Sequence, residues 1–148
     1  MFKTLILSVV MLFSYIGPVE YIQEEQAPVE FWDVFDSKGH DLSTEDINSA
    51  VDILMVGTTQ STIVKYIIGC ESQYISNAIN YNTAVGEDVG LFQINTYYHQ
   101  ERAVELGYNL YKPSDNLKFG KLLLDEQGLQ PWAHSKHCWE KLASNIVI

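Results

Sequence analysis

The chain has 148 residues, is 47% hydrophobic and carries a formal net charge of -10, which predicts one globular domain and excludes collagen-like, coiled-coil and wholly disordered proteins. Most of the negative charge lies in residues 1–60, with ten acidic residues against two lysines, whereas residues 61–148 have nine acidic residues against seven basic ones. We expect no nucleic-acid partner, because no basic patch is interleaved with aromatic residues, but an anionic polymer is not excluded as a substrate.

The amino terminus is typical of an export segment. Lys3 is followed by an uncharged run over residues 4–19, which has the length of a signal-peptide core and is shorter than the roughly 20 apolar residues of a membrane-spanning helix. Gly17-Pro18 makes a poor cleavage junction, so residues 1–17 are either a signal peptide or an uncleaved anchor. We expect an exported protein, which is secreted, periplasmic or tethered to the membrane through residues 4–19 and facing outward.

Residues 18–42 are predicted to form an acidic linker or an irregular wrap, because they combine prolines and glutamates with little periodicity. Three aromatic residues, Phe31, Trp32 and Phe35, lie within this segment. Aromatic residues spaced so closely often dock on a neighbouring domain, and we therefore expect part of the segment to pack against the core.

Two amphipathic helices are predicted next. Ser43 offers a side-chain cap for a helix that ends near Gly57, with apolar residues at helical spacing. A second helix is expected to start between residues 59 and 61, and Glu71 ends its apolar stripe. A carboxyl group in that position is partly desolvated, which raises its pKa toward that of a general acid. The alternative is a solvated Glu71 or one paired with a lysine.

Turn and strand residues fill the stretch from 78 to 95. Asn, Asp and Gly punctuate it, and its end alternates apolar and polar side chains, so we expect a short hairpin beside the second helix. Such a hairpin could present several amides and the Asp88 carboxylate to sugar hydroxyls. An ordinary capped surface hairpin has the same composition.

Two further helices are predicted over residues 99–107 and 115–127, ended by Gly107 and Gly128. Aromatic residues flank this region and could stack on sugar rings, although core packing is the more frequent role of any one of them. They include Trp132, Trp139, Tyr97 and Tyr98, and the pair Tyr97-Tyr98, which follows Asn95 directly, is preferred over Trp139 as a lining of the binding groove.

The chain has two cysteines, Cys70 and Cys138. In an exported protein an even number favours a disulfide, which would clamp the carboxy-terminal segment to the predicted Glu71 helix. Two buried free thiols are the alternative. His134 and His137 lie close to Cys138 in the sequence, but the spacing suggests no fourth ligand, so no metal site is predicted.

Several residues at fixed offsets resemble a known family. Glu71-Ser72, Asn80-x-Asn82 and the run from Asp88 to Asn95 are similar to the active-site stretch of animal-type (c-type) lysozymes, including the seventeen positions between the two carboxylates. Glu71-Ser72 and Gly-Leu-Phe-Gln-Ile also resemble the soluble lytic transglycosylases of the same superfamily, as does the segment 115–123. The resemblance covers residues 61–139 and is densest over 70–95.

The resemblance implies a mainly α (α+β) fold, a lysozyme-like helical domain over residues 43–148 with a short β-hairpin lining a glycan-binding cleft. It implies cleavage of peptidoglycan glycan strands between N-acetylmuramic acid and N-acetylglucosamine by a monomer without a cofactor. Glu71 would be the general acid, and Asp88 would stabilise or attack the cationic centre. In the transglycosylase variant Glu71 would serve as both acid and base, the muramyl 6-hydroxyl would close an anhydro ring, and Asp88 would be a positioning residue. The residues expected to bind the substrate are Ser72, Asn80, Asn82, Gln93, Asn95 and Tyr97.

Two departures leave the choice between the two relatives open. The chain lacks the rich disulfide framework of animal lysozymes, and it has no convincing equivalent of the Tyr-Asn pair found near the end of transglycosylase domains. Two functions outside this enzyme class also stay open. One is a non-catalytic glycan-binding or structural module on the same fold, and the other is a membrane-tethered partner protein that uses the acidic segment 20–52.

Overall fold

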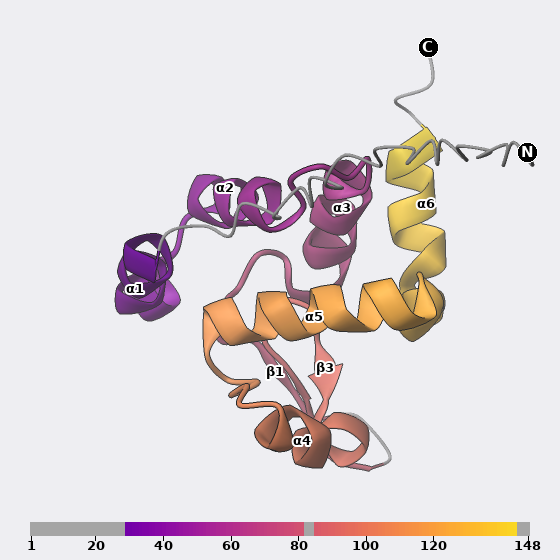
Figure 1. The fold of residues 1–148 in the computed structure, drawn as a ribbon. Helices are drawn as coiled ribbons and strands as arrows, with labels where there is room; N and C mark the ends of the chain where they lie inside the picture. Colours follow the sequence, from indigo (N-terminus) through magenta and orange to yellow (C-terminus); the bar gives the residue numbers. More distant parts are fainter. Residues whose placement is uncertain (1–28, 82–84, 145–148) are drawn as a thin grey trace, which may run out of the picture.

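The computed structural model describes residues 29–81 and 85–144. The predicted signal peptide or anchor over residues 1–17, the tether over 4–19 and the predicted substrate contact Asn82 lie outside the described residues. Within them the chain forms six α-helices, two short 3-10 helices and one small antiparallel sheet (Figure 1). The prediction of a mainly helical, lysozyme-like fold is therefore confirmed.

The first two predicted helices are present. α2 (Thr44–Leu54) begins with a capping box, in which the Ser43 hydroxyl accepts a hydrogen bond from the Asp46 amide at 3.1 Å and the Asp46 carboxylate accepts one from the Ser43 amide at 3.0 Å. α3 (Ser61–Ser72) starts within the predicted range. The buried faces of both helices carry the apolar residues expected from the sequence, namely Ile47, Ala50, Val51, Val64, Ile67 and Ile68.

The prediction of irregular structure before residue 42 was wrong for residues 29–38, which form helix α1 (Val29–Lys38), followed by the 3-10 turn η1 (Gly39–Asp41). The predicted docking of its aromatic residues is confirmed, since Phe35 is buried and Phe31 and Trp32 pack against the core. Docking on another element supplies the stability that a helix this short lacks by itself.

The sheet has three strands in the order β1 (Ile79–Asn80), β2 (Asp88–Val89) and β3 (Ile94–Asn95). Ile79 pairs with Val89, and Asp88 pairs with Asn95. The hairpin was predicted within residues 78–95, and the structure has two antiparallel pairs there, β1 with β2 and β2 with β3. Asp88 lies in the central strand, so its backbone is flanked by β1 on one side and by β3 on the other.

Four helical segments complete the described part of the chain: α4 (Thr96–Glu105), α5 (Pro113–Gln127), η2 (Gln130–Ser135) and α6 (Lys136–Ser144). α5 runs through the middle of the molecule, with α3 on one side and the sheet and α4 on the other, while α6 stands beside α3 (Figure 1). α6 was not predicted. Among the described residues, no helix is both long enough and apolar enough to cross a bilayer.

Two close contacts fix the turn between β2 and β3 against α5. The side chain of Asn116 donates to the Val89 and Leu110 carbonyls at 3.0 and 2.9 Å and accepts from the Phe92 amide at 3.0 Å. Gly120 lies so close to Phe92 that a Cβ atom on it would be 2.1 Å from the ring. These contacts hold the turn that carries Gln93 against the core.

Candidate active site

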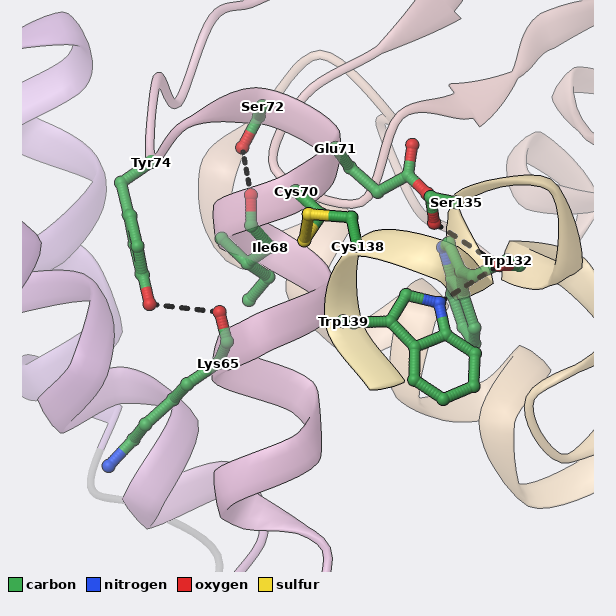
Figure 2. Close-up of a disulfide and its surroundings, with 10 residues drawn as sticks. All are labelled: Lys65, Ile68, Cys70, Glu71, Ser72, Tyr74, Trp132, Ser135, Cys138 and Trp139. Carbon is green, nitrogen blue, oxygen red and sulfur yellow. Dashed lines mark hydrogen bonds between the residues drawn. A yellow bond between two sulfur atoms is a disulfide. The ribbon is translucent and has the colours of Figure 1, made fainter. Parts of the chain in front are cut away.

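Glu71 lies in the last turn of α3, on the same stripe as the buried Ile67 and Ile68, and is itself half-buried. Its carboxylate oxygen Oε1 accepts a hydrogen bond from the hydroxyl of Ser135, at the end of η2 (Figure 2). The helix thus delivers the carboxyl group to the junction between α3 and the carboxy-terminal helices. The half-buried position of Glu71 at the end of an apolar stripe is the position predicted from the sequence.

Burial raises the pKa of the Glu71 carboxyl above its ordinary value, and the nearby negative charge of Asp88 raises it further. The hydrogen bond from Ser135 and the positive charge of His134 act in the opposite direction, because both favour the carboxylate. Desolvation is the largest of these effects, so the net direction is upward. A glutamate with a raised pKa carries a proton over a wider pH range, which suits a general acid.

The backbone changes direction sharply after Glu71. Gln73 and Tyr74 have φ values of 54° and 62°, in the left-handed region that costs a residue with a side chain about 1 kcal/mol or more. The Tyr74 hydroxyl donates to the Lys65 carbonyl at 2.8 Å, which ties this turn back to α3 (Figure 2). The tie holds the end of α3 in one orientation, and with it Glu71.

A platform made of η2 and the start of α6 carries Ser135. The Trp132 indole N–H donates to the Phe92 carbonyl at 3.0 Å, and the Trp139 indole N–H donates to the Trp132 carbonyl at 3.0 Å. Both indoles are buried, so the core role is the one that the structure assigns to these two tryptophans. The platform is therefore fixed to the turn that follows β2.

A disulfide joins Cys70 to Cys138, with 6.1 Å between their Cα atoms. The predicted bridge is thus present, and it links the residue before Glu71 to the third residue after Ser135 (Figure 2). Cys138 is accordingly not available as a metal ligand beside His134 and His137. The covalent link holds the donor and the acceptor of the Glu71 hydrogen bond on adjoining elements.

Asp88 is half-buried in β2, and its Oδ1 accepts a hydrogen bond from the Asn95 side-chain amide at 2.8 Å. The negative charge of Asp88 raises the pKa of Glu71, so the two carboxyl groups interact electrostatically although they lie seventeen positions apart in the sequence. A hydrogen-bonded carboxylate in a polar surrounding is the expected partner of a desolvated acid.

Two of the predicted substrate contacts have internal partners. The Asn95 amide also donates to the Val85 carbonyl at 3.1 Å, and its oxygen caps α4 by accepting from the Tyr97 amide at 3.0 Å. The Gln93 amide donates to the Gly90 carbonyl at 2.8 Å and the Ala78 carbonyl at 3.3 Å. Both side-chain amides therefore stabilise the sheet and its turn. The sequence alone does not distinguish this structural role from sugar binding.

The remaining predicted contacts differ in exposure. Ser72 is buried and its hydroxyl donates to the Ile68 carbonyl at 3.1 Å, so a contact between Ser72 and a sugar finds no support in this geometry. Asn80 is exposed in β1. Tyr97 is 67% exposed and packs edge-on against Tyr98, with 5.1 Å between ring centroids, so a face of the pair is open to solvent.

Sequence reasoning missed the role of Ser135. It lies in the region that was compared with the Tyr-Asn pair of transglycosylase domains, and its hydrogen bond to Glu71 joins residues 64 positions apart. It also missed the Tyr111 hydroxyl, which donates to the Glu87 carboxylate beside β2. Both contacts join residues far apart in the chain, and no local pattern encodes them.

Residues 56–137 match the sequence model of the Transglycosylase SLT domain, which covers more than half of the chain. The chain belongs to the SLT transglycosylase domain family. The matched span contains Glu71, Asp88 and Ser135 and ends just before Cys138. Comparison with curated proteins gave no match, and neither did comparison with solved structures.

Membership of the SLT family supports a peptidoglycan-related activity of the lytic transglycosylase type. SLT domains act on peptidoglycan outside the cytoplasm, and a disulfide is typical of proteins that reach an oxidising compartment. Both observations fit an exported protein.

Proposed function

We propose that this SLT domain cleaves the β-1,4 bond between N-acetylmuramic acid and N-acetylglucosamine in peptidoglycan glycan strands, with Glu71 as the general acid. The observation that carries the proposal is the half-buried Glu71 carboxyl, whose pKa is raised by desolvation and by Asp88. Its position at the end of an apolar stripe keeps it protonated where an ordinary glutamate has ionised.

In the first step Glu71 donates its proton to the glycosidic oxygen. The bond between that oxygen and the muramyl C1 breaks, its electron pair stays on the leaving oxygen, and positive charge develops at C1. The Glu71 carboxylate formed in this step then removes a proton from the group that attacks C1. After the attack Glu71 is protonated again, and the cycle is complete.

The identity of the attacking group separates two reactions. In lytic transglycosylation it is the muramyl 6-hydroxyl, which closes an anhydro ring, and in hydrolysis it is water. Family membership favours the first reaction. Asp88 then stabilises the positive charge at C1 without forming a bond to it, consistent with a carboxylate that is already held by the Asn95 amide.

The sugar chain would lie along the sheet wall that carries Asp88. Exposed Asn80 in β1 and the open Tyr97–Tyr98 pair at the start of α4 are the candidates for contacts with sugar hydroxyls and ring faces. Asn95 and Gln93 contribute indirectly by holding Asp88 and the turn. No cofactor is needed, because acid and base are supplied by one carboxyl group.

Zymography on purified peptidoglycan tests the proposal with wild type, Glu71→Gln and Glu101→Gln. Glu101 is an exposed glutamate on α4 and serves as the matched control. We expect clearing by wild type and by Glu101→Gln, and none by folded Glu71→Gln. Full activity of Glu71→Gln would contradict the proposed role, and binding to peptidoglycan without clearing by any of the three would support a non-catalytic glycan-binding module.

Mass analysis of the released fragments decides between the two reactions. Anhydro products are lighter by one water than hydrolytic products of the same composition. We expect the anhydro form in wild type and its loss in Glu71→Gln. Products that contain the added water would assign this chain to the hydrolytic, lysozyme-like reaction.

We also propose export of this protein through residues 1–17, with the segment 4–19 as either a cleaved signal core or a retained tether. The disulfide and the extracellular substrate of the family support export. Fractionation of cells that produce the full chain, followed by amino-terminal sequencing, would show whether the segment is removed. Recovery of all the protein in the cytosol would contradict export.

A further inference from the structure

The Ser135 hydroxyl has one hydrogen and two acceptors within reach. It lies in hydrogen-bond contact with Glu71 Oε1, and it is also 3.2 Å from the Trp132 carbonyl oxygen. A hydroxyl donates one hydrogen bond at a time and can accept others. The single hydroxyl hydrogen of Ser135 therefore has two competing acceptors.

The second acceptor is fixed in place. The Trp132 carbonyl already accepts a hydrogen bond from the Trp139 indole at 3.0 Å, and a carbonyl oxygen has a second lone pair for Ser135. Trp132 is itself held by its indole bond to the Phe92 carbonyl. Neither acceptor has to move for the Ser135 hydroxyl to turn from one to the other.

We infer that Ser135 is a positioning residue whose hydroxyl follows the protonation state of Glu71, because one Oγ lies between the Glu71 carboxyl and the Trp132 carbonyl. When Glu71 is a carboxylate, Ser135 donates to it. When Glu71 is protonated, the hydroxyl turns to Trp132, and its oxygen accepts the Glu71 proton in a hydrogen bond. Ser135 gains and loses no proton in either state.

This arrangement suits a residue that acts first as an acid and then as a base, and to that extent it rests on the proposed function. A fixed donor would favour the carboxylate alone and a fixed acceptor the protonated acid alone. A hydroxyl that can reverse its direction satisfies both forms without moving the carboxyl group. The Glu71 side chain therefore keeps one position through both steps of the cycle.

Other charged groups also face Glu71 and must be kept constant in a test. Asp88 from β2 favours its protonated form, and His134 from η2 favours its carboxylate. Substitutions at Ser135 leave both residues in place. Any change in the Glu71 titration then belongs to the hydroxyl itself.

The test titrates Glu71 directly, by the NMR shift of its side-chain carboxyl carbon, in wild type, Ser135→Ala, Ser135→Thr and Ser144→Ala. Ser144 is the matched control, since its hydroxyl donates to the Lys141 carbonyl three residues earlier on α6, as Ser135 does to Trp132. The hydrogen bond that Ser135 donates to the charged carboxylate is stronger than the one it accepts from protonated Glu71, so loss of the hydroxyl should raise the Glu71 pKa in Ser135→Ala. The titration should return toward wild type in Ser135→Thr and be unchanged in Ser144→Ala.

The Trp132 carbonyl carbon provides a second readout. In wild type its NMR shift should titrate with the same pKa as Glu71, because the Ser135 hydrogen bond arrives as Glu71 takes up its proton. In Ser135→Ala that titration should disappear. If Trp132 titrates equally in both proteins, or if Glu71 titrates in Ser135→Ala as in wild type, the inference is overturned.

Turnover provides an independent readout. In Ser135→Ala we expect kcat on peptidoglycan strands to fall by about tenfold with little change in KM. The alkaline limb of the rate profile should move to higher pH with the Glu71 pKa, and Ser135→Thr should recover most of the rate. An unchanged profile and kcat would contradict the inference.

The two proposals can fail separately. The NMR titrations need no turnover, so an inactive wild type with the expected titrations would reject the proposed function and keep the role of Ser135. If Ser135→Ala does not fold, Ser135→Cys replaces it, because a thiol of similar size is a weak donor. The same shift in the Glu71 titration is then required, and its absence overturns the inference.

Discussion

The Trp132 indole donates a hydrogen bond to the Phe92 carbonyl across forty positions of sequence, at 3.0 Å. Phe92 belongs to the turn between β2 and β3, and Trp132 belongs to the platform that carries Ser135. The bond therefore connects the strand of Asp88 with the hydroxyl that contacts Glu71. Several consequences of this connected site can be measured.

The first prediction concerns stability and pH. Burial and Asp88 raise the pKa of Glu71 in the folded protein, so the folded state binds this proton more tightly than the unfolded chain. The stability contributed by the protonated Glu71 is present below the ordinary glutamate pKa and is lost as the pH rises through the raised pKa. Glu71→Gln cannot ionise, so its free energy of unfolding relative to wild type should increase as the pH rises.

Urea unfolding at a series of pH values checks this prediction. The difference between Glu71→Gln and wild type should grow from mildly acidic to neutral pH, whereas Glu101→Gln, with an exposed side chain, should show no such trend. A difference that is constant with pH would mean that the Glu71 pKa is the same in the folded and unfolded states.

The second prediction concerns the disulfide. Cys70 and Cys138 are separated by 68 positions, and closing a loop of that length stabilises the folded state by about 4 kcal/mol in the chain-entropy model. Cys70→Ser/Cys138→Ser should lower the free energy of unfolding by about that amount. Chemical denaturation with and without a reductant measures it, and the reductant should affect wild type but not the double variant.

The third prediction concerns Gly120. Alanine is the better helix former, but its Cβ would lie 2.1 Å from the Phe92 ring, and Phe92 is also bonded through its backbone to Asn116 and Trp132. We expect Gly120→Ala to destabilise the protein by about 2 kcal/mol, as overpacking of a core does.

A double-mutant cycle separates this contact from a general effect on α5. Phe92→Leu has a smaller side chain, and in that background Gly120→Ala should cost clearly less than in wild type. Equal costs in the two backgrounds would show that the Phe92 ring is not what resists the extra methyl group. Thermal and urea unfolding supply the four free energies.

The fourth prediction concerns Asp36. Its carboxylate accepts hydrogen bonds from the Ser114 amide and hydroxyl at 2.9 and 2.6 Å and pairs with Lys112 at 3.0 Å. A side chain of α1 thus provides the hydrogen-bond acceptor for a backbone amide in the first turn of α5. Asp36→Ala should lower the free energy of unfolding by about 2 kcal/mol. Asp33→Ala, on the exposed side of α1, is the control and should have little effect.

Local patterns predicted much of the fold. The Ser43 cap and the apolar stripes identified α2 and α3, and Gly128, with a φ of 62°, ends α5 at the expected position. α4 starts before the predicted residue 99, because Asn95 caps it. An asparagine at this position is a recognisable helix cap, but Asn95 was predicted as a substrate contact.

What the sequence could not indicate depends on contacts between distant segments. α1 was predicted as irregular because its helix is supported by Asp36 and Phe35 against α5, not by periodicity. α6 was not predicted for a similar reason. The disulfide of Cys138 joins it to α3, and the hydrogen bond of the Trp139 indole joins it to η2.

The candidate site divides in the same way. The sequence predicts Glu71 and Asp88 as site residues from a spaced motif, and the disulfide that it predicts between the two cysteines is present. Ser135 was found only when the chain was folded, since a single serine in an aromatic-rich segment carries no pattern. The Ser72 substrate contact came from the motif alone, and the buried hydroxyl does not support it.

The extent of the core bears on how this protein should be shortened for experiments. The family match covers residues 56–137, whereas buried residues continue on both sides, with Phe35 and Ile47 before it and Trp139 after it. A fragment cut at the family boundaries would expose apolar surface and would lack Cys138, one of the two cysteines of the disulfide. A fragment that keeps every buried residue of the described ranges therefore has to include both α1 and α6.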